Sequence, residues 1–310
     1  MTFRRPRELL PAVTSVTPAD NQGRPDGPAR DSAKPRIRLP ALVFTDLDGT
    51  LLDHDSYSAG AALDALRELE AHGVPVIMNT SKTFAETLEY QALLQAPTPF
   101  IAENGGVICV PGEFPFALEA DIHESGYHLL IQPPGIEAIV ARVRRIGDTL
   151  GVRFDSFHQR DATWVSQQTG LDLYHAELAR RRLGSLPILW RDVDGKLASF
   201  REALASEGLG LLRGGRFHHV VGPWDKASSM QQVLTLYASL GWSGIQCIAL
   251  GDSPNDETML AAADIAVAVR DHRGRHLSLA GHPHPVFTLS SGPAGWSEAV
   301  TMLLRPDGPS

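Results

Sequence analysis

Short apolar segments alternate with helical segments through most of this sequence, and that order constrains the fold more than any other feature. Residues 41–47 (ALVFTDL) and 74–80 (VPVIMNT) have the continuous apolar character of buried strands. Residues 59–72 and 82–94 carry apolar positions at helical spacing. A strand, helix, strand order favours a parallel sheet with right-handed crossovers.

The same alternation returns in the C-terminal part of the chain. We expect helices at 226–240 and 255–263, strands at 244–252, 264–269 and 286–290, and a last helix that ends near Leu304. The segment between these two parts has a different pattern. It is helical at 136–150 and 173–182 and strand-like at 187–192 and 216–222. The predicted fold class is therefore α/β, with a Rossmann-like parallel-sheet core at 39–115 and 216–304 and an inserted α+β cap domain at 116–215.

The two ends of the chain lack this periodicity. Residues 1–38 are rich in Pro, Gly, Asp and Arg, and the apolar run LLPAV is too short for a signal peptide. We therefore predict a disordered N-terminal tail at 1–38 and a short C-terminal tail at 305–310.

Charge and cysteine content narrow the class of protein. The chain has 28 Lys and Arg against 36 Asp and Glu, and this acidic balance argues against a nucleic-acid partner. Gly, Pro or a charge interrupts every apolar run before the roughly 20 residues that a membrane span needs. Cys109 and Cys247, the two cysteines, lie in apolar runs, which favours reduced thiols and a cytoplasmic enzyme.

Polar clusters occur where the predicted core strands end or the next helix begins. They are 46–50 (DLDGT), 80–82 (TSK), 225–226 (DK) and 251–256 (GDSPND). Ligands of open parallel sheets bind outside the carboxyl ends of the strands. The four clusters therefore predict one catalytic site.

Four aspartates in these clusters indicate a magnesium site. Asp46 and Asp48 are two residues apart and would point the same way in a continuing strand. Two such close carboxylates need a cation or a shared proton, and Asp252 and Asp256 add further acid. A hard cation such as Mg²⁺ prefers these oxygen ligands.

Thr80 and Lys226 complete a site for a phosphate group. A threonine hydroxyl and a lysine ammonium both suit phosphate oxygens. A carboxylate, a metal, a hydroxyl and a lysine around one phosphate indicate phosphoryl transfer through an aspartyl-phosphate.

The motifs DLDGTLLD, NTSKT, DK and GDSPND, in this order, resemble the four motifs of haloacid dehalogenase-like phosphohydrolases. The resemblance implies that Asp46 is the nucleophile, that Asp48 is the general acid and base, and that Thr80 and Lys226 bind the phosphate. It also implies that Mg²⁺ is held by Asp46, by the Asp48 backbone carbonyl and by Asp252, with Asp256 in or behind the metal shell.

A finer resemblance is to mannosyl-3-phosphoglycerate phosphatases. It is carried by VFTDLDGTLLDHDSYS, NTSKTFAE, FIAENGGVI, QQTGL, PILWRD and GGRFHHVVG, which span core and cap. It implies a phosphorylated sugar-glycerate substrate, Mg²⁺ as cofactor, and release of mannosylglycerate, a compatible solute.

Recognition of such a substrate needs cations for its carboxylate. The candidates are Ser81 and Lys82, next to Thr80, and Arg216 in the Gly-Gly-Arg-Phe stretch. Arg216 could instead pair with an acid between cap and core, and Lys82 could be a solvated lysine. Glu103-Asn104-Gly105-Gly106 is interpreted as a turn.

Two other functions remain open at this point. One is a phosphatase or phosphomutase for sucrose-, trehalose- or hexose-phosphates, since cap specificity decides the substrate. The other is a non-catalytic binding protein on the same scaffold, although such a protein does not need both Asp46 and Asp48. The sequence does not indicate an oligomeric state.

Overall fold

The computed structural model describes residues 35–115, 119–213 and 216–305. The predicted tails at 1–38 and 305–310 therefore lie almost entirely outside the described residues. The Ile37 amide donates to the Leu303 carbonyl (3.1 Å) and the Arg38 amide to the Gln246 side chain (2.7 Å), so these two residues, which precede the expected start of the core at 39, also bond to it.

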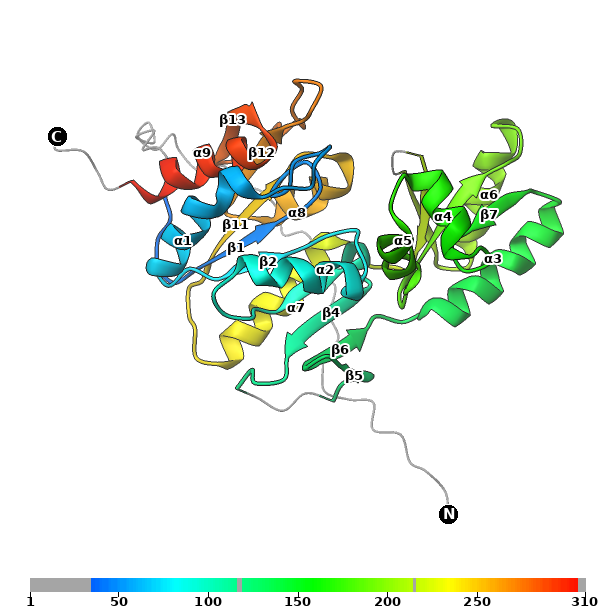
Figure 1. Ribbon diagram of the computed structural model, residues 1–310, viewed down its shortest axis with the longest axis horizontal. Helices are drawn as coiled ribbons and strands as arrows, with labels where there is room; N and C mark the ends of the chain where they lie inside the picture. Colours follow the sequence, from blue (N-terminus) through cyan, green and yellow to red (C-terminus); the bar gives the residue numbers. More distant parts are fainter. Residues whose placement is uncertain (1–34, 116–118, 214–215, 306–310) are drawn as a thin grey trace, which may run out of the picture. The chain divides into compact units, whose positions relative to one another are not determined.

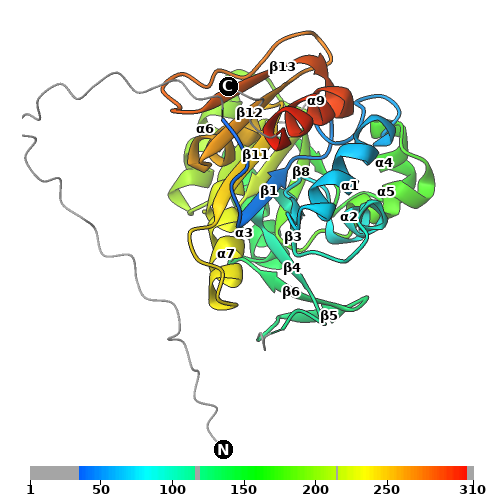
Figure 2. The same ribbon diagram turned by 90° about the vertical axis from the view of Figure 1, so that its left-hand side faces the viewer.

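The core is built on a parallel sheet of five strands (Figures 1 and 2). Its order is β13-β12-β11-β1-β2, and every neighbouring pair is parallel. The strands are β1 (Ala41–Thr45), β2 (Val76–Met78), β11 (Gln246–Gly251), β12 (Ile265–Arg270) and β13 (Pro285–Ser291). The predicted α/β core with a parallel sheet is confirmed.

Helices cover both faces of this sheet. Ala41 and Val43 of β1 pack into one apolar cluster with α1 (Leu63–Ala71) and α9 (Gly292–Leu304), which lie side by side in Figures 1 and 2. The alternate residues Leu42 and Phe44 pack into a second cluster with α7 (Lys226–Ser239) and α8 (Glu257–Ala262). Because successive side chains point to opposite faces and both faces are covered, β1 is buried at every position.

A second sheet of four antiparallel strands continues from the edge of the first, through a parallel bridge between Asn79 and Ile101. Its order is β3-β4-β6-β5, with β3 (Phe100–Ala102), β4 (Val107–Pro111), β5 (Ile122–Glu124) and β6 (Tyr127–Ile131). The cap was expected to begin at residue 116. Backbone pairing of β4 with β6 instead keeps the chain with the core as far as Ile131.

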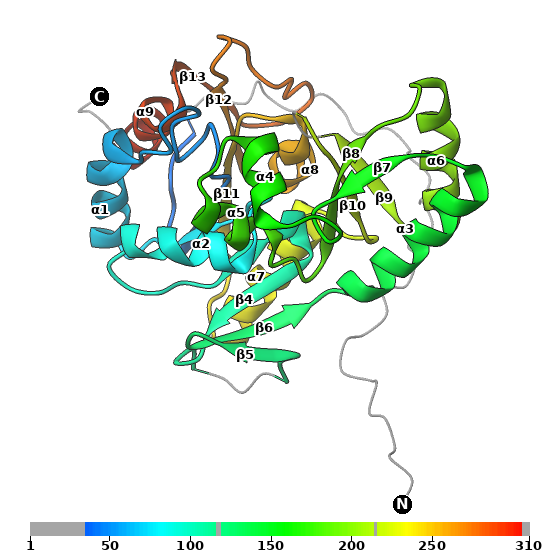
Figure 3. The ribbon, with the colours of Figure 1, turned by 45° about the vertical axis from the view of Figure 1, so that its right-hand side comes forward.

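The cap contains the third sheet, whose order is β7-β8-β10-β9. The strands are β7 (Phe154–Ser156), β8 (Ser185–Trp190), β9 (Gly210–Arg213) and β10 (His218–Val221). Helices α3 (Ile136–Leu150) and α6 (Gly195–Ser206) pack on it, and α4 (Ala162–Thr169) pairs with α5 (Leu173–Arg180) (Figure 3). β10 pairs with β8 and β9, so residues 218–221 lie in the cap sheet, although the core was expected to resume at 216. We propose a cap that comprises about residues 132–224.

The remaining elements are short. Helix α2 (Phe84–Tyr90) begins with a capping box in which Thr83 and Glu86 bond each other's backbone amides. Single 3-10 turns span Gly60–Ala62, Gln91–Leu93, Glu103–Gly105 and Pro254–Asp256. Within the described residues, every helix is too short or too polar to cross a membrane.

Candidate active site

Asp46 lies directly after β1, at the carboxyl end of the sheet. Its amide donates to the Leu250 carbonyl of β11 (3.0 Å), and its side chain is buried. The chain then folds back in a tight loop that needs Gly49, because its φ is +82° and a Cβ there would stand 2.7 Å from Asp252 Oδ2. The loop therefore brings the first and last motifs into contact.

Lys226 is the first residue of α7, and its ammonium group is fully buried between two carboxylates. Asp225 caps the helix by accepting a hydrogen bond from the Ser228 amide (2.8 Å). Lys226 Nζ donates to Asp46 Oδ1 (2.6 Å) and to Asp256 Oδ1 (2.7 Å). Burial alone would lower the pKa of Lys226, but Asp256 and Asp46 outweigh it and raise that pKa. The lysine is held as a cation beside Asp46.

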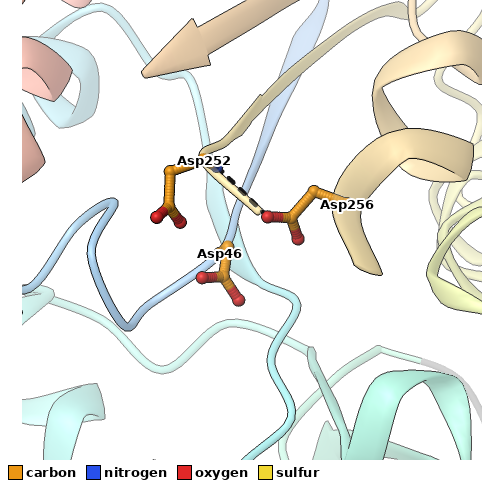
Figure 4. Close-up of side chains that lie close together, drawn as sticks. All are labelled: Asp46, Asp252 and Asp256. Atoms are coloured by element: carbon orange, nitrogen blue, oxygen red, sulfur yellow. Dashed lines mark hydrogen bonds between the residues drawn. The ribbon is translucent and has the colours of Figure 1, made fainter. Parts of the chain in front are cut away.

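Asp252 and Asp256 lie just after β11 (Figure 4). Asp256 Oδ2 accepts hydrogen bonds from the amides of Asp252 (3.2 Å) and Ser253 (3.1 Å), while Oδ1 accepts from Lys226. Asp252 Oδ1 accepts from the Thr50 hydroxyl (2.9 Å). Both oxygens of Asp256 are therefore occupied by the protein.

Asp46, Asp252 and Asp256 each place a carboxylate oxygen within 4.8 Å of the other two, a spacing that suits a metal ion. Asp46 Oδ2 and Asp252 Oδ2 accept no hydrogen bond from any residue that the structure describes. Burial, and then Asp256, raises the pKa of Asp252 to about 7. Burial also raises the pKa of Asp46, and the neighbouring acids add to it, although Lys226 opposes them. A divalent cation between the two open oxygens would relieve this repulsion, so the residues fit Mg²⁺. We call Asp46, Lys226, Asp252 and Asp256 the acidic centre.

Asp48 is outside the group of carboxylates that could share a metal ion, although its charge helps to raise the pKa of Asp46 and Asp252. Strand β1 ends at Thr45, so the alternation expected for a continuing strand does not apply to Asp46 and Asp48. Lys82 Nζ stands 2.9 Å from Asp48 Oδ1, while Lys226 bonds Asp46. Asp46 and Asp48 are therefore each paired with a different lysine.

The second motif lies between these two aspartates and the cap. Thr80 is buried, and its hydroxyl oxygen accepts a hydrogen bond from the Lys82 amide (3.2 Å). The Ser81 carbonyl accepts from Arg182 of the cap (2.8 Å). Burial would lower the pKa of Lys82, but Asp48 and then Glu86 raise it, so Lys82 is a cation. Arg216 is exposed and bonds no residue within the described part of the chain.

The predicted turn at Glu103 is present, and the Glu103 side chain also bonds to the cap, which the sequence did not indicate. Glu103 is fully buried and accepts hydrogen bonds from three successive cap amides, Leu183, Gly184 and Ser185 (2.8, 3.1 and 2.8 Å), and from the Ser185 hydroxyl (2.7 Å). Glu103 and Asn104 both have positive φ, near +55°. We call Glu103, Ser185 and the neighbouring Arg182 the cap junction.

Comparisons with known proteins agree with this geometry. Residues 43–126 and 220–282 match the model of the haloacid dehalogenase-like hydrolase family. A glucosyl-3-phosphoglycerate/mannosyl-3-phosphoglycerate phosphatase of Methanococcoides burtonii is 35% identical over 273 residues, which are 85% of this chain and 97% of that protein.

Solved structures share the fold. A Thermoplasma acidophilum protein superposes with a TM-score of 0.59 at 15% identity, over 87% of this chain and 99% of its own. A Bacteroides thetaiotaomicron protein, described among phosphatases of the haloalkanoate enzyme superfamily, has a TM-score of 0.59 at 19% identity, over 89% and 97%.

The chain belongs to the haloacid dehalogenase-like hydrolases. Within that class it is an enzyme that hydrolyses phosphoric monoesters.

Proposed function

We propose that this protein is a Mg²⁺-dependent phosphatase that converts mannosyl-3-phosphoglycerate or glucosyl-3-phosphoglycerate to the glycosylglycerate and phosphate. The observation that carries the proposal is the acidic centre, where Lys226 holds one oxygen of Asp46 and the other oxygen is open beside Asp252. The named activity of the Methanococcoides burtonii relative, which this chain covers almost completely, supports the substrate.

Asp46 is the proposed nucleophile. Its carboxylate oxygen attacks the phosphorus atom, and the bond from phosphorus to the glycerate oxygen breaks, so the phosphoryl group passes to Asp46. Lys226, held against Asp46 at 2.6 Å, offsets negative charge on the transferred group. A bound Mg²⁺ would supply further positive charge at the same phosphate.

Asp48 is the proposed proton donor and acceptor. It gives a proton to the departing glycerate oxygen, and it then takes one from the water that attacks the aspartyl-phosphate, so phosphate leaves and Asp46 is restored. Lys82, 2.9 Å from Asp48, holds this carboxyl group in place.

We assign the remaining site residues to binding of the phosphate, of the rest of the substrate or of the metal. Thr80 would bind the phosphate, and Ser81, Lys82 and Arg216 remain predictions for the rest of the substrate. Asp252, like Asp46, offers an open oxygen to the metal, whereas Asp256 would act from behind by fixing Lys226 and the 252–253 backbone.

The proposal also includes the role of the product and the compartment of the enzyme. The products of these substrates are glycosylglycerates, which the family resemblance links to compatible-solute synthesis. Cys109 and Cys247 are both free and buried, which suits the reducing cytoplasm that we propose for the enzyme.

The test is phosphate release with and without Mg²⁺ from mannosyl-3-phosphoglycerate, glucosyl-3-phosphoglycerate, mannose-6-phosphate, sucrose-6-phosphate and 3-phosphoglycerate. We expect release that depends on Mg²⁺ and is fastest for the two glycosyl-phosphoglycerates. A preference for sucrose- or hexose-phosphate would replace the substrate but keep the chemistry. No metal-dependent release from any ester would refute the proposal in favour of a mutase or a binding protein.

A further inference from the structure

A pocket of about 290 Å³ opens beside the second motif, and the proposed function so far gives it no role. Its walls come from the loop after the first motif, from α2 and from the cap. The residues that matter here are Tyr57, Lys82, Glu89, Tyr90, Leu171 and His175. At roughly 30 Å³ per water, the pocket holds on the order of ten waters, close to the size of one sugar ring.

Lys82 connects the pocket to the catalytic residues. Lys82 lines it and also contacts Asp48 at 2.9 Å, and Asp48 is the proposed donor to the departing oxygen. The phosphate is expected on the opposite side, at Asp46 and Lys226. Whatever is attached to the departing oxygen beyond Asp48 is therefore directed toward this pocket.

Two tyrosine rings flank the entrance. The Lys82 ammonium stands 4.8 Å from the centre of the Tyr57 ring and 5.8 Å from that of Tyr90. Within the part of the chain that the structure describes, neither phenol hydroxyl makes a hydrogen bond, so both are available to a ligand. An aromatic ring with a free polar tip matches the mixed apolar and hydroxyl surface of a sugar.

Tyr57 is held in this position at a conformational cost. Its φ is +54°, in the left-handed region that few non-glycine residues adopt. The loop maintains it through Asp53, whose carbonyl accepts from the Tyr57 amide (3.0 Å) and whose carboxylate accepts from the Ser56 amide (2.9 Å). Such strain persists where the surrounding structure enforces it, and it concentrates at functional sites.

The far wall is polar and comes partly from the cap. Glu89 accepts a hydrogen bond from the Tyr174 hydroxyl (2.8 Å) and faces His175 Nε2 at 3.4 Å, while Leu171 adds an apolar contact. Carboxylate and imidazole groups bond sugar hydroxyls, and their mutual contacts fix their orientation.

We propose that this pocket binds the glycosyl group of the substrate, with Tyr57 and Tyr90 as its specificity-determining residues. The inference rests on the proposed function and adds a subsite to it. It predicts that the enzyme distinguishes a glycosylated phosphoglycerate from 3-phosphoglycerate, which carries the same phosphate and carboxylate.

The experiment compares kcat/KM for glucosyl- or mannosyl-3-phosphoglycerate with kcat/KM for 3-phosphoglycerate. In Tyr57→Ala and Tyr90→Ala we expect the ratio of the two to fall tenfold or more, about 1.4 kcal/mol at tenfold. Tyr57→Gly should lose the ratio equally while its backbone suits the left-handed conformation, so a folding defect does not account for the result. Phe287→Ala, which removes an aromatic ring of similar exposure on β13, is the matched control.

A binding measurement without turnover accompanies the kinetics. Calorimetry with glycosylglycerate, which lacks the phosphate, should show at least tenfold weaker binding to both alanine variants than to the wild-type enzyme. If the wild type prefers glycosylated esters but the variants keep both the ratio and the affinity, the subsite is refuted and the proposed function stands. If the wild type hydrolyses 3-phosphoglycerate equally well, the proposed substrate falls, and the subsite falls with it.

Discussion

Asp46 in the acidic centre and Glu103 in the cap junction are both buried carboxylates, but the groups around them differ in kind. Glu103 accepts four hydrogen bonds from the backbone and side chain of residues 183–185. Asp46 has one ammonium partner, one open oxygen and acidic neighbours that raise its pKa. A buried carboxylate whose oxygens all accept hydrogen bonds stabilises the fold. A buried carboxylate with an oxygen that accepts no hydrogen bond can instead bind a cation and react.

Removal of the Asp46 charge should give the largest effect on activity. In Asp46→Asn we expect turnover to fall by at least about 1000-fold, on the order of 4 kcal/mol of barrier, because the nucleophile is lost. The thermal midpoint should not fall, since Lys226 keeps Asp256 as a partner and one repulsive charge is gone. Phosphate release and calorimetric unfolding check the two parts. Retained turnover in this variant would contradict the mechanism.

Mg²⁺ should stabilise the acidic centre. Saturating Mg²⁺ should raise the thermal midpoint, because a ligand at about 100 times its Kd adds about 2.7 kcal/mol to the stability of the folded state. In Asp252→Asn the increment should disappear and turnover should fall about 100-fold. Asp64→Asn, at an exposed aspartate paired with Arg67, is the control and should keep both. An equal increment in Asp252→Asn would remove Asp252 from the metal site.

The same contrast explains what could be predicted from the sequence. Asp46, Lys226 and Asp252 were predicted to meet because parallel strands expose their carboxyl ends at one edge, so local motifs and strand order determine the site. The contact of Glu103 with Ser185 instead joins a turn beside β3 to the first residue of β8 in the separate cap sheet, 82 positions along the chain. Such a contact depends on how two separate sheets pack together, which local patterns do not show.

The cap boundaries that we propose differ from the expected ones for the same reason. Residues 216–222 precede the Asp225-Lys226 motif, so they were assigned to the core, yet β10 pairs with two cap strands. Strands β5 and β6 are only partly buried, and nothing in their local sequence indicates that β6 pairs with β4. In both places the domain to which a strand belongs depends on its partner strand in the sheet, and the local sequence does not specify that partner.

The cap junction should respond to Glu103→Gln mainly in stability. The side-chain amide keeps one acceptor oxygen but presents N–H groups to backbone amides, so we expect unfolding to become easier by about 1–3 kcal/mol. Urea unfolding measures the change. The control Glu298→Gln also affects a glutamate that accepts backbone hydrogen bonds, from Leu289 and Ser290, but at a more exposed position. The free energy of unfolding of Glu298→Gln should stay within about 0.5 kcal/mol of the wild type. An equally small effect in Glu103→Gln would show that Glu103 does not stabilise the cap junction.

The smallest effect should come from His219, which lies on β10 near Arg182 of the cap junction. Burial, and then Arg182 and His218, lowers the pKa of His219 to about 3 in the folded protein. Because the unfolded histidine binds a proton near pH 6.5, stability is lost as the pH falls below that value. His219→Leu removes this contribution, so its loss of stability between pH 7.5 and pH 6 should be about 1 kcal/mol smaller than in the wild type. Thermal unfolding at both pH values measures the difference, with His158→Leu, at an exposed histidine, as the control. An unchanged pH dependence in His219→Leu would show that protonation of His219 does not contribute to the loss of stability at low pH.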